Sequence, residues 1–514
     1  MEKLFLIVAL LCFAFNFTIL CLYYLHMFQL NSYKPHEQRK WLKDNFLSAI
    51  LSRNTTSILA ICALPFGLVG YIISSVLFLL GGYINLPKTA KKPLVYTNRI
   101  KRMLITLGII MAIIIAVVFI KTKTIILLPV ILFLSSFIVL FANLLNRPIE
   151  KSINNYYIND AKKMIKEMPD LKVIGITGSY GKTSVKYFLN KLLSAKYNVL
   201  MTPESFNTTL GVVKTIRTSL KATHEIFICE MGAKNIGDIK EICDIVNPYY
   251  GVITSIGPQH LESFKSIENV ILTKFELADA VNREGVVFLN NDNEYIKSQT
   301  VLQKSVKYGI TSSDCDYIAY DIKVSDKGSS FKMKLDNIEY VFQTKLIGAH
   351  NVLNIAGAIS VAHTLGVKAD DLIYQTKLLE SVPHRLQLIK GNNALIIDDA
   401  YNSNPSGAKA ALDTLSAFDG VKILVTPGMI ELGEKQDECN RIFGTQASKV
   451  CDYVVLVGEK QTKSIYQGLL DANYSTTKII VANNLKDALK AVENIKTNNL
   501  QKIVLLENDL PDNY

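Results

Sequence analysis

The sequence predicts an α-helical membrane module followed by two α/β domains. Apolar runs near or above the length of a membrane span fill the first part of the 514-residue chain. In the remainder, short apolar runs typical of buried strands alternate with amphipathic helical stretches, which indicates largely parallel sheets covered by helices. A glycine-rich loop joins the first of these strands to a helix.

The membrane module is predicted to cover residues 1–148. Four apolar runs, each near or above the roughly 18–20 residues that cross a bilayer core, occupy positions 4–24, 58–84, 103–120 and 125–145. The first run has an alternative as a cleaved signal peptide, although the later runs would still anchor the chain. The second run contains Pro65 and several glycines, so a re-entrant hairpin is its alternative. Four spans are expected, which places the basic loops 32–56 and 88–102 on opposite sides.

Basic residues concentrate in this module. Residues 1–148 hold 15 Lys and Arg against 3 Asp and Glu, whereas the remainder holds 41 against 42. The soluble part has no basic surplus, so the high pI is no argument for binding nucleic acid, and no nucleic-acid partner is expected. Basic loops beside membrane spans suit anionic headgroups, and membrane lipid is therefore a predicted partner.

The eight cysteines indicate a reducing environment. Three lie in apolar runs, and the others show no C-x-x-C or metal-ligand spacing. No disulfide is expected, which fits a cytosolic soluble part. The predicted location is the cell membrane, crossed several times, with the soluble domains in the cytoplasm.

The soluble part is long enough for two domains. Its last third is especially regular: strand-like runs at 394–397, 422–425, 453–457, 478–481 and 503–506 alternate with helical stretches. That rhythm predicts a small, Rossmann-like, doubly wound domain. A break around Pro383 separates the two, giving a central domain at 149–380 and a C-terminal domain at 381–514.

The most informative stretch is 173–184, VIGITGSYGKTS. An apolar strand, two glycines, a lysine, a hydroxyl residue and a helix follow in the order of a phosphate-binding loop, as in P-loop ATPases. Ile176 stands where the common motif has its first glycine, and a chance Gly-Lys-Thr turn is the alternative. We predict ATP and Mg²⁺ as ligands, with Lys182 on the outer phosphates and Thr183 on the metal. The predicted ATP-binding residues of the loop are Thr177, Gly178, Ser179, Tyr180, Gly181, Lys182, Thr183 and Ser184.

Three further polar residues are candidates for the same site. Glu230 ends an apolar strand, where an acidic side chain beside a phosphate loop typically holds Mg²⁺. His260 follows another strand and a glycine turn, and Lys274 lies on a predicted helix. Their plain alternatives are a solvated carboxylate, a structural histidine and an exposed lysine. The polar loop 202–212 suits a polar substrate, with an ordinary turn as its alternative.

Taken in order, these motifs resemble the Mur ligase family. The resemblance extends over 173–458 and rests on ITGSYGKTS, the loop 202–212, EMGA at 230, GPQHLE at 257, TKFE at 273, GAHNVLN at 348, HRL at 384, IDDAYNSNP at 397 and GMIELG at 428. It implies an ATP-dependent ligase that transfers the γ-phosphoryl group to a carboxylate and then couples the acyl phosphate to an amine. The catalytic residues it implies are Lys182, Glu230, His260 and Lys274.

The resemblance also implies roles for other residues. Mg²⁺ would be held by Thr183, Glu230 and His260, with Lys274 joining them if it is carbamylated, which needs a neutral amine. Asn351, Asn354, Arg385 and Asp399 would contribute to nucleotide binding. The implied substrate-binding residues are Ser205, Phe206, Asn207, Thr208, Asn402 and Asn404.

The implied substrates belong to cell-wall precursor synthesis. An amino acid or a D-Ala-D-Ala-like dipeptide would be joined to the carboxylate of a muramyl peptide. Two features depart from the family: a membrane module replaces the domain that grips the uridine nucleotide, and the tail LLENDLPDNY lacks the expected Lys-Gly-Ser-Arg-type segment. A lipid-linked acceptor is therefore a hypothesis. A poly-γ-glutamate-type ligase and a membrane-bound ATP-binding scaffold without ligase activity remain alternatives.

Overall fold

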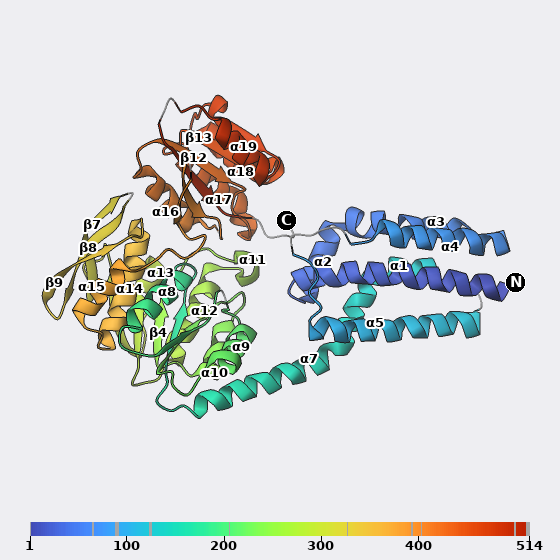
Figure 1. The fold of residues 1–514 in the computed structure, drawn as a ribbon, viewed down its shortest axis with the longest axis horizontal. Coiled ribbons are helices and arrows are strands. Elements are labelled where there is room, and N and C mark those ends of the chain that lie inside the picture. Colours follow the sequence, from blue (N-terminus) through green and yellow to red (C-terminus); the bar gives the residue numbers. More distant parts are fainter. Residues whose placement is uncertain are drawn as a thin grey trace. The chain divides into compact units, whose positions relative to one another are not determined.

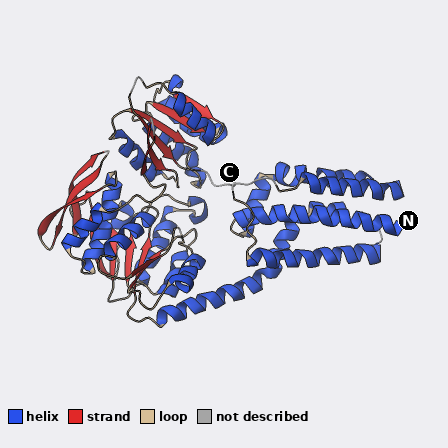
Figure 2. Ribbon diagram, viewed as in Figure 1, coloured by secondary structure: helices blue, strands red, loops and turns tan. Residues whose placement is uncertain are grey.

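The computed structural model describes residues 2–63, 66–87, 92–122, 126–204, 206–325, 327–391, 394–401, 403–497 and 500–509. The chain divides into two compact units. The first extends to Tyr156, and the second comprises Tyr157–Asp509. The first is all helical, whereas the second contains two β-sheets, each covered by helices (Figures 1 and 2).

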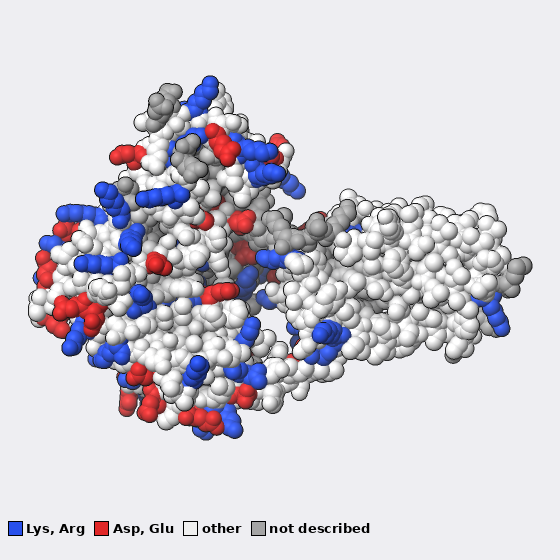
Figure 3. Space-filling view, in the orientation of Figure 1, with Lys and Arg blue, Asp and Glu red and all other residues white. Residues whose placement is uncertain are grey.

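The first unit is a bundle of apolar helices. Its elements are α1 Glu2–Leu30, α2 Pro35–Asp44, η1 Phe46–Leu51, η2 Ser52–Asn54, α3 Thr55–Ala63, α4 Gly67–Ile84, α5 Asn98–Val117, η4 Val118–Thr122, α6 Leu128–Phe133 and α7 Ser135–Lys166, which continues into the second unit. Four helical segments are long and apolar enough to cross a membrane, namely Lys3–Leu30, Phe46–Ala63, Gly67–Ile84 and Asn98–Ile120. In Figure 3, most of the surface of this bundle carries no charged side chain.

Two of the predicted spans are wrong in detail. The run 58–84 is not one span but the end of one helical segment and the whole of α4, which begins at Gly67 with a left-handed φ of 55°. Only a residue without a side chain adopts that conformation without strain, so the chain turns there. The run 125–145 is not among the four membrane-length segments found in the described residues, because α6 and α7 meet at a break at Leu134.

The division of the run 58–84 into two helical segments changes the position of the basic loops. Hydrogen bonds at one end of the bundle run from Gln29 to Val95, from Arg53 to Asn85 and from Arg102 to Glu150. At the same end, the rings of Tyr23 and Trp41 pack 6.2 Å apart. The segments 32–45 and 92–102 therefore lie together, and the expectation that they lie on opposite sides is wrong.

The central domain contains a nine-stranded sheet in the order β2-β3-β1-β4-β5-β6-β7-β8-β9. Its strands are β1 Lys172–Thr177, β2 Val199–Met201, β3 Ile226–Glu230, β4 Tyr250–Ile253, β5 Val286–Asn290, β6 Lys304–Gly309, β7 Tyr317–Ser325, β8 Gly328–Leu335 and β9 Ile338–Thr344. Strands β1 to β7 pair in parallel, and β7 to β9 form an antiparallel extension. Its helices are α8 Lys182–Leu193, α9 Thr209–Ser219, α10 Asp238–Val246, α11 Leu261–Phe264, α12 Ile267–Ala280, α13 Glu294–Lys297, α14 Ala349–Thr364 and α15 Ala369–Lys377.

Apolar side chains on both faces of this sheet bury the strands. Ile174 and Ile176 of β1 join a core with α8 and α14, whereas Val173 faces α10 and α12. Because successive residues of a strand point to opposite faces, a run of consecutive apolar residues marks a strand covered on both sides. The carboxyl ends of these parallel strands meet at one edge, where Thr177 and Glu230 end β1 and β3.

The C-terminal domain contains a six-stranded sheet in the order β10-β11-β15-β12-β13-β14. Its elements are β10 Gln387–Lys390, β11 Ala394–Asp399, α16 Pro405–Ser416, β12 Val421–Thr426, η5 Gly433–Lys435, α17 Gln436–Ala447, β13 Tyr453–Val457, α18 Glu459–Asp471, η6 Thr476–Lys478, β14 Ile479–Ala482, α19 Leu485–Asn494 and β15 Lys502–Glu507. All pairings are parallel except that of β10 with β11. Both predicted α/β domains are confirmed, and each of the five predicted strands is present.

Candidate active site

The glycine-rich loop joins the carboxyl end of β1 to the first turn of α8. Gly181 caps α8 with a left-handed φ of 80°, and a Cβ at Gly178 would clash with the hydroxyl of Thr254. The loop is tied to the neighbouring strand because the N–H of Ser179 donates to the carbonyl of Ser255 over 2.6 Å. The exposed amides at the start of α8 can thus face an anion, as phosphate loops require.

Lys182 closes over this loop. Its Nζ donates to the carbonyl oxygens of Gly178 at 2.6 Å and Ser179 at 3.0 Å. Burial lowers the pKa of Lys182 to about 8, against the opposing effect of Glu230 and with a further lowering by Arg385. The ammonium group is therefore placed over the loop and is poorly solvated.

The other predicted loop residues serve mainly to shape it. The hydroxyl of Thr177 donates to the carbonyl of Met231, that of Tyr180 donates to the carbonyl of Pro258, and Ser184 is buried on α8. These contacts hold the loop from both sides.

Two of the predicted nucleotide-binding residues from other elements act on the loop, Asn354 by contact and Arg385 through its charge. A Cβ at Gly181 would lie 2.6 Å from Oδ1 of Asn354, so this side chain lies against the loop. Arg385 lowers the pKa of Lys182 and stacks its guanidinium 4.1 Å from the ring centre of Tyr401. Asn351, in contrast, donates to the carbonyl of Ile347 just before α14, and among the described residues no hydrogen bond joins its side chain to the loop.

Glu230 lies beside the loop in a dense network. Its Oε1 accepts from the hydroxyl of Thr183 and from the amide of Asn207, each at 3.1 Å, and its Oε2 lies 2.9 Å from Nζ of Lys186. Burial raises the pKa of Glu230, but Lys186, Lys182 and the hydrogen bonds outweigh it, so the pKa is lowered overall. A solvated strand-end carboxylate is excluded, because only 1 % of Glu230 is exposed.

Sequence reasoning missed Lys186, which is completely buried. A signal was present: it lies among the apolar residues Val185, Phe188 and Leu189 on the inner face of α8. A lysine in such a position is stable only with acceptors around its ammonium group.

His260 approaches from the start of α11, with a left-handed φ of 51°. Its Nδ1 lies 2.5 Å from Oε2 of Glu431, a residue of the C-terminal domain that sequence reasoning did not single out. The bond to His260 lowers the pKa of Glu431 to about 2, against the opposing effect of burial. Burial also lowers the pKa of His260, and the charge of Lys182 contributes to that lowering, so the ring faces the loop's electrostatic field.

Lys274 lies on α12 with 2 % of its surface exposed, which excludes an ordinary surface lysine. Burial and the positive charge of Lys182 lower its pKa to about 7, against the opposing effect of Asp238 and Glu276. The centre of the Phe264 ring lies 6.0 Å from its Nζ. The charge of Lys182 also affects the pKa values of Glu230 and His260.

The predicted substrate residues divide into two groups. Ser205 and Asn402 lie outside the described residues. Of the rest, Thr208 and Asn404 are helix N-caps, accepting from the amides of Gly211 at 3.4 Å and Gly407 at 2.7 Å. Phe206 packs under Lys214, and Asn207 binds both Glu230 and the main chain of Gly232.

Acidic residues gather at the carboxyl edge of the C-terminal sheet. Asp399 and Glu507 are register partners on β11 and β15, and Ser403 donates to Glu507 over 2.6 Å. Burial raises the pKa of Asp399 to about 6, against Arg385 and a hydrogen bond from Leu386, and burial also raises that of Glu507. Sequence reasoning missed Glu507, because β15 is the last strand of the chain and becomes a neighbour of β11 only in the folded sheet.

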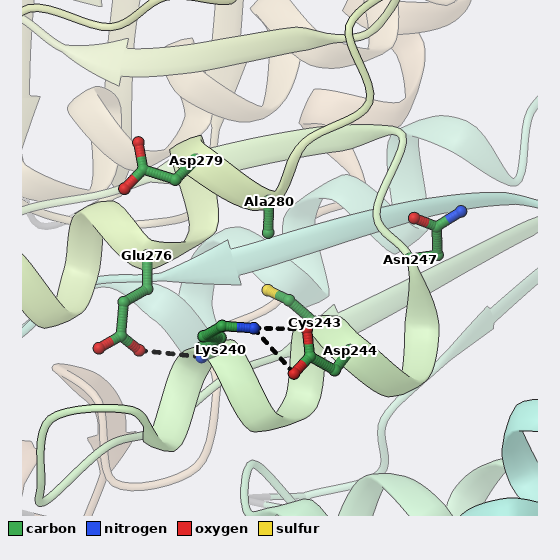
Figure 4. Close-up of a pocket in the computed structure, with 7 residues that line it drawn as sticks. All are labelled: Lys240, Cys243, Asp244, Asn247, Glu276, Asp279 and Ala280. Carbon is green, nitrogen blue, oxygen red and sulfur yellow. Dashed lines mark hydrogen bonds and ion pairs between the residues drawn. The ribbon is translucent and has the colours of Figure 1, made fainter.

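A small cavity lies at His260 and Glu431. It is lined from both domains, by Pro258, Gln259, His260, Ser403, Asn404, Ile430, Glu431 and Leu432. A groove of about 550 Å³ lies elsewhere, between α10 and α12. Figure 4 shows its lining, where Glu276 points toward Lys240 and accepts from that residue's N–H at 2.9 Å. This second groove contains none of the predicted site residues.

Known proteins match this fold and these motifs. The Mur ligase middle domain matches residues 176–362, and the Mur ligase glutamate ligase domain matches residues 384–506. UDP-N-acetylmuramoyl-tripeptide–D-alanyl-D-alanine ligase of Bacillus subtilis is 32 % identical over 337 residues, which are 65 % of this chain and 72 % of that protein. The Escherichia coli ligase with the same description is 28 % identical, over 63 % of this chain and 74 % of the relative.

Solved structures agree. MurF from Acinetobacter baumannii superposes with a TM-score of 0.63 at 25 % identity, covering 70 % of this chain and 78 % of that one. MurF ligase from Thermotoga maritima in complex with ADP gives 0.61 at 26 % identity, covering 69 % and 80 %. Fold, site and relatives define an ATP-dependent ligase. The chain belongs to the Mur ligase family, and within it the chain is MurF-like.

Proposed function

We propose that this protein forms an amide bond through an acyl phosphate during peptidoglycan synthesis. A substrate carboxylate oxygen attacks the γ-phosphorus of ATP, the bond to the bridging oxygen breaks, and ADP leaves. The amine nitrogen then attacks the carbonyl carbon, inorganic phosphate leaves, and the nitrogen gives up a proton. The first step brings two anions together, so it needs cations at the meeting point. The supporting observation is that Lys182 lies over the glycine-rich loop and that Thr183, at the end of this loop, donates to the buried carboxylate of Glu230.

The residues beside the loop fit a magnesium ion. Mg²⁺ prefers oxygen ligands and keeps several waters, and the hydroxyl of Thr183 lies 3.1 Å from Oε1 of Glu230, close enough for both to serve one ion. Because Thr183 and Glu230 lie together, they would hold the ion, with His260 as a third candidate. The described part of the chain contains no group of three acidic, cysteine or histidine residues with metal-ligand geometry, so water would supply the remaining ligands. When bound, the ion would neutralise charge on the phosphates.

Lys274 is proposed to carry a carbamate. Its neutral amine would attack carbon dioxide and release a proton, turning a cation into an anion able to serve a second metal ion. The support is its burial and its pKa of about 7, which leaves much of the amine neutral at cytosolic pH. Within the described residues, no carboxylate forms an ion pair with it that would hold it as an ammonium ion.

The proposed substrates are those that appear in the names of the relatives. A D-alanyl-D-alanine-like dipeptide or an amino acid would supply the amine, and a muramyl tripeptide would supply the carboxylate. The family match begins at residue 176, and an apolar helical bundle precedes it. We propose that the acceptor is lipid-linked, because an enzyme held in the plane of the membrane meets such a substrate at high effective concentration.

The deciding experiment measures ADP formation by the purified full chain in detergent. Uridine-nucleotide-linked and lipid-linked muramyl peptides are compared, each with and without the dipeptide. Faster turnover of the lipid-linked acceptor is expected. Full activity on the soluble acceptor alone would contradict the lipid-linked proposal. An ATP-binding scaffold would release no phosphate with either acceptor, and a poly-γ-glutamate-type ligase would respond to glutamate instead.

We also propose that the basic end of the helical bundle faces the cytoplasm. Most of the described Lys and Arg residues of the bundle lie at this end, including Arg39, Arg53 and Arg102, and basic residues favour the cytoplasmic side. The start of α1 would then lie on the opposite side. In intact cells, a membrane-impermeant thiol reagent should label Lys3→Cys and should spare Lys34→Cys until the membrane is permeabilised. The reverse pattern would refute this orientation.

A further inference from the structure

Lys186 lies one helical turn beyond the phosphate loop and makes contacts in two directions. On one side its Nζ is 2.9 Å from Oε2 of Glu230. On the other it donates a hydrogen bond to the main-chain carbonyl of Glu204. No part of Lys186 is exposed to solvent, so these acceptors replace its hydration shell.

The second contact fixes the start of the loop 202–208. Glu204 has a left-handed φ of 43°, which is unfavourable for a residue with a side chain. Its carbonyl oxygen meets the buried ammonium in that conformation, which compensates for the strain. The same loop sends Asn207 to Oε1 of Glu230, and Thr202 accepts from the N–H of Glu230 at 3.1 Å.

The two oxygens of Glu230 are thereby distinguished. Oε2 makes an ion contact with Nζ of Lys186 at 2.9 Å and accepts no hydrogen bond from the described residues, whereas Oε1 accepts from Thr183 at the end of the glycine-rich loop and from Asn207. Groups that hydrogen-bond to a metal ligand fix its orientation, and their loss typically weakens metal binding by about 10–100-fold. A buried ion pair by itself gives little net stability, so this geometry is better explained by orientation.

We infer that Lys186 is a positioning residue that orients Glu230 toward the metal and ties the main chain of Glu204 to the same carboxylate. This inference rests on the proposed function, because it takes Glu230 as a magnesium ligand. Metal-bound ATP and an ordered substrate loop would then depend on one buried ammonium group. A purely structural lysine would support folding without any influence on the metal dependence of nucleotide binding.

The test compares ATP binding by the full chain in Mg²⁺ and in EDTA, measured by titration calorimetry in detergent. For Lys186→Met we expect ATP affinity in EDTA within about twofold of wild type, and a loss of about tenfold or more in the strengthening by Mg²⁺. The matched control is Lys191→Met, an exposed lysine on the same helix, which should behave as wild type. A folded Lys186→Met that retains the full magnesium effect would overturn the inference.

A second comparison separates this inference from the proposed function. If Glu230→Gln also retains the full magnesium effect, Glu230 is not the metal ligand, and both ideas fail together. If Glu230→Gln loses it and Lys186→Met does not, only the positioning role fails. Should Lys186→Met not fold by circular dichroism, Lys186→Gln replaces it with the same expected loss, because its amide is too short to reach both acceptors.

Discussion

The two sheets of the catalytic unit present opposite charges at their carboxyl edges. At the edge of the nine-stranded sheet, Lys182 lies over the glycine-rich loop, Lys186 contacts Glu230, and Lys274 is buried on the neighbouring helix α12. The corresponding edge of the six-stranded sheet gathers acids, which are Asp398, Asp399, Glu507 and the nearby Glu431. The charge of Arg385 acts on Asp399, His384 contacts Asp398, and His260 and Lys234 contact Glu431.

The pKa values at the two edges move in opposite directions for the same reason. Burial lowers the pKa values of Lys182 and Lys274, and burial raises those of Asp399 and Glu507. In each case the charged form is the one that burial disfavours. Under the proposed function, the first edge would attract the triphosphate and the carboxylate, and the second edge would attract an amine that arrives as an ammonium ion.

Among the variants that test the difference between the two edges, removal of the loop lysine should lower ADP formation most. Lys182→Ala takes the cation from above the loop, and we expect ADP formation to fall by about 10³-fold or more. The measurement is ADP release with saturating carboxylate and amine. Lys191→Ala serves as the control, and turnover of Lys182→Ala close to wild type would remove Lys182 from the chemistry.

The second effect concerns the charge of Lys274. Lys274→Ala should lower turnover by about 10²-fold, because a proposed anion beside the metal is lost. If that anion is a carbamate, acetate at high concentration should restore part of the activity. The same acetate should leave Lys182→Ala inactive. Loss of activity without any rescue would favour an uncharged or cationic role for Lys274.

The third effect tests the acidic edge through stability. The pKa of Asp399 is about 6 in the folded protein against about 3.8 for an unperturbed aspartate, so the folded state loses stability as pH rises from about 4 to about 6. Asp399→Asn should therefore be more stable than wild type at pH 7.5. The gain should vanish at pH 4 and below. Denaturant unfolding at both pH values measures it, and an equal gain at both would refute the assignment.

The smallest effect is expected at the bridge between the domains. Nζ of Lys234 lies 3.4 Å from Oε1 of Glu431, and both side chains are partly exposed. Exposed ion pairs contribute about 0–1 kcal/mol, so Lys234→Ala should leave turnover within about twofold of wild type. Glu431→Gln, which weakens the bond to His260 as well, should cost more. Equal losses in the two variants would show that the bridge acts mainly through Lys234.

Local sequence patterns predicted much of the catalytic unit. The strand at 173–176 and five strands of the C-terminal sheet were identifiable because parallel strands covered on two faces are continuously apolar, as at 173–176 and 503–506. The phosphate loop was identifiable because its glycines, its lysine and its helix start are contiguous. Glu230 was a candidate because it ends an apolar strand, and the structure places it against Thr183. The role of Lys274 came from the family resemblance and stays a prediction, although its side chain is buried as that role requires.

Other features could not be predicted because they depend on residues distant in the sequence. Glu431 meets His260 across 171 positions, and Glu507 meets Asp399 only because β15 inserts between β11 and β12. The division of 58–84 into two segments depends on the backbone at Gly67 and on how the helices pair, which hydropathy averaged over a window does not detect.

The sequence alone predicted the two α/β domains, the glycine-rich loop between a strand and a helix, and the ligase family, because propensity, hydrophobic period and short motifs act over a few neighbouring residues. Tertiary structure decided which ionisable groups face one another. It buried Lys186 against Glu230, joined Glu431 to His260, and brought the basic segments 32–45 and 92–102 to one end of the bundle. The physical reason is that electrostatic interaction and burial depend on distance in space, and only packing sets those distances.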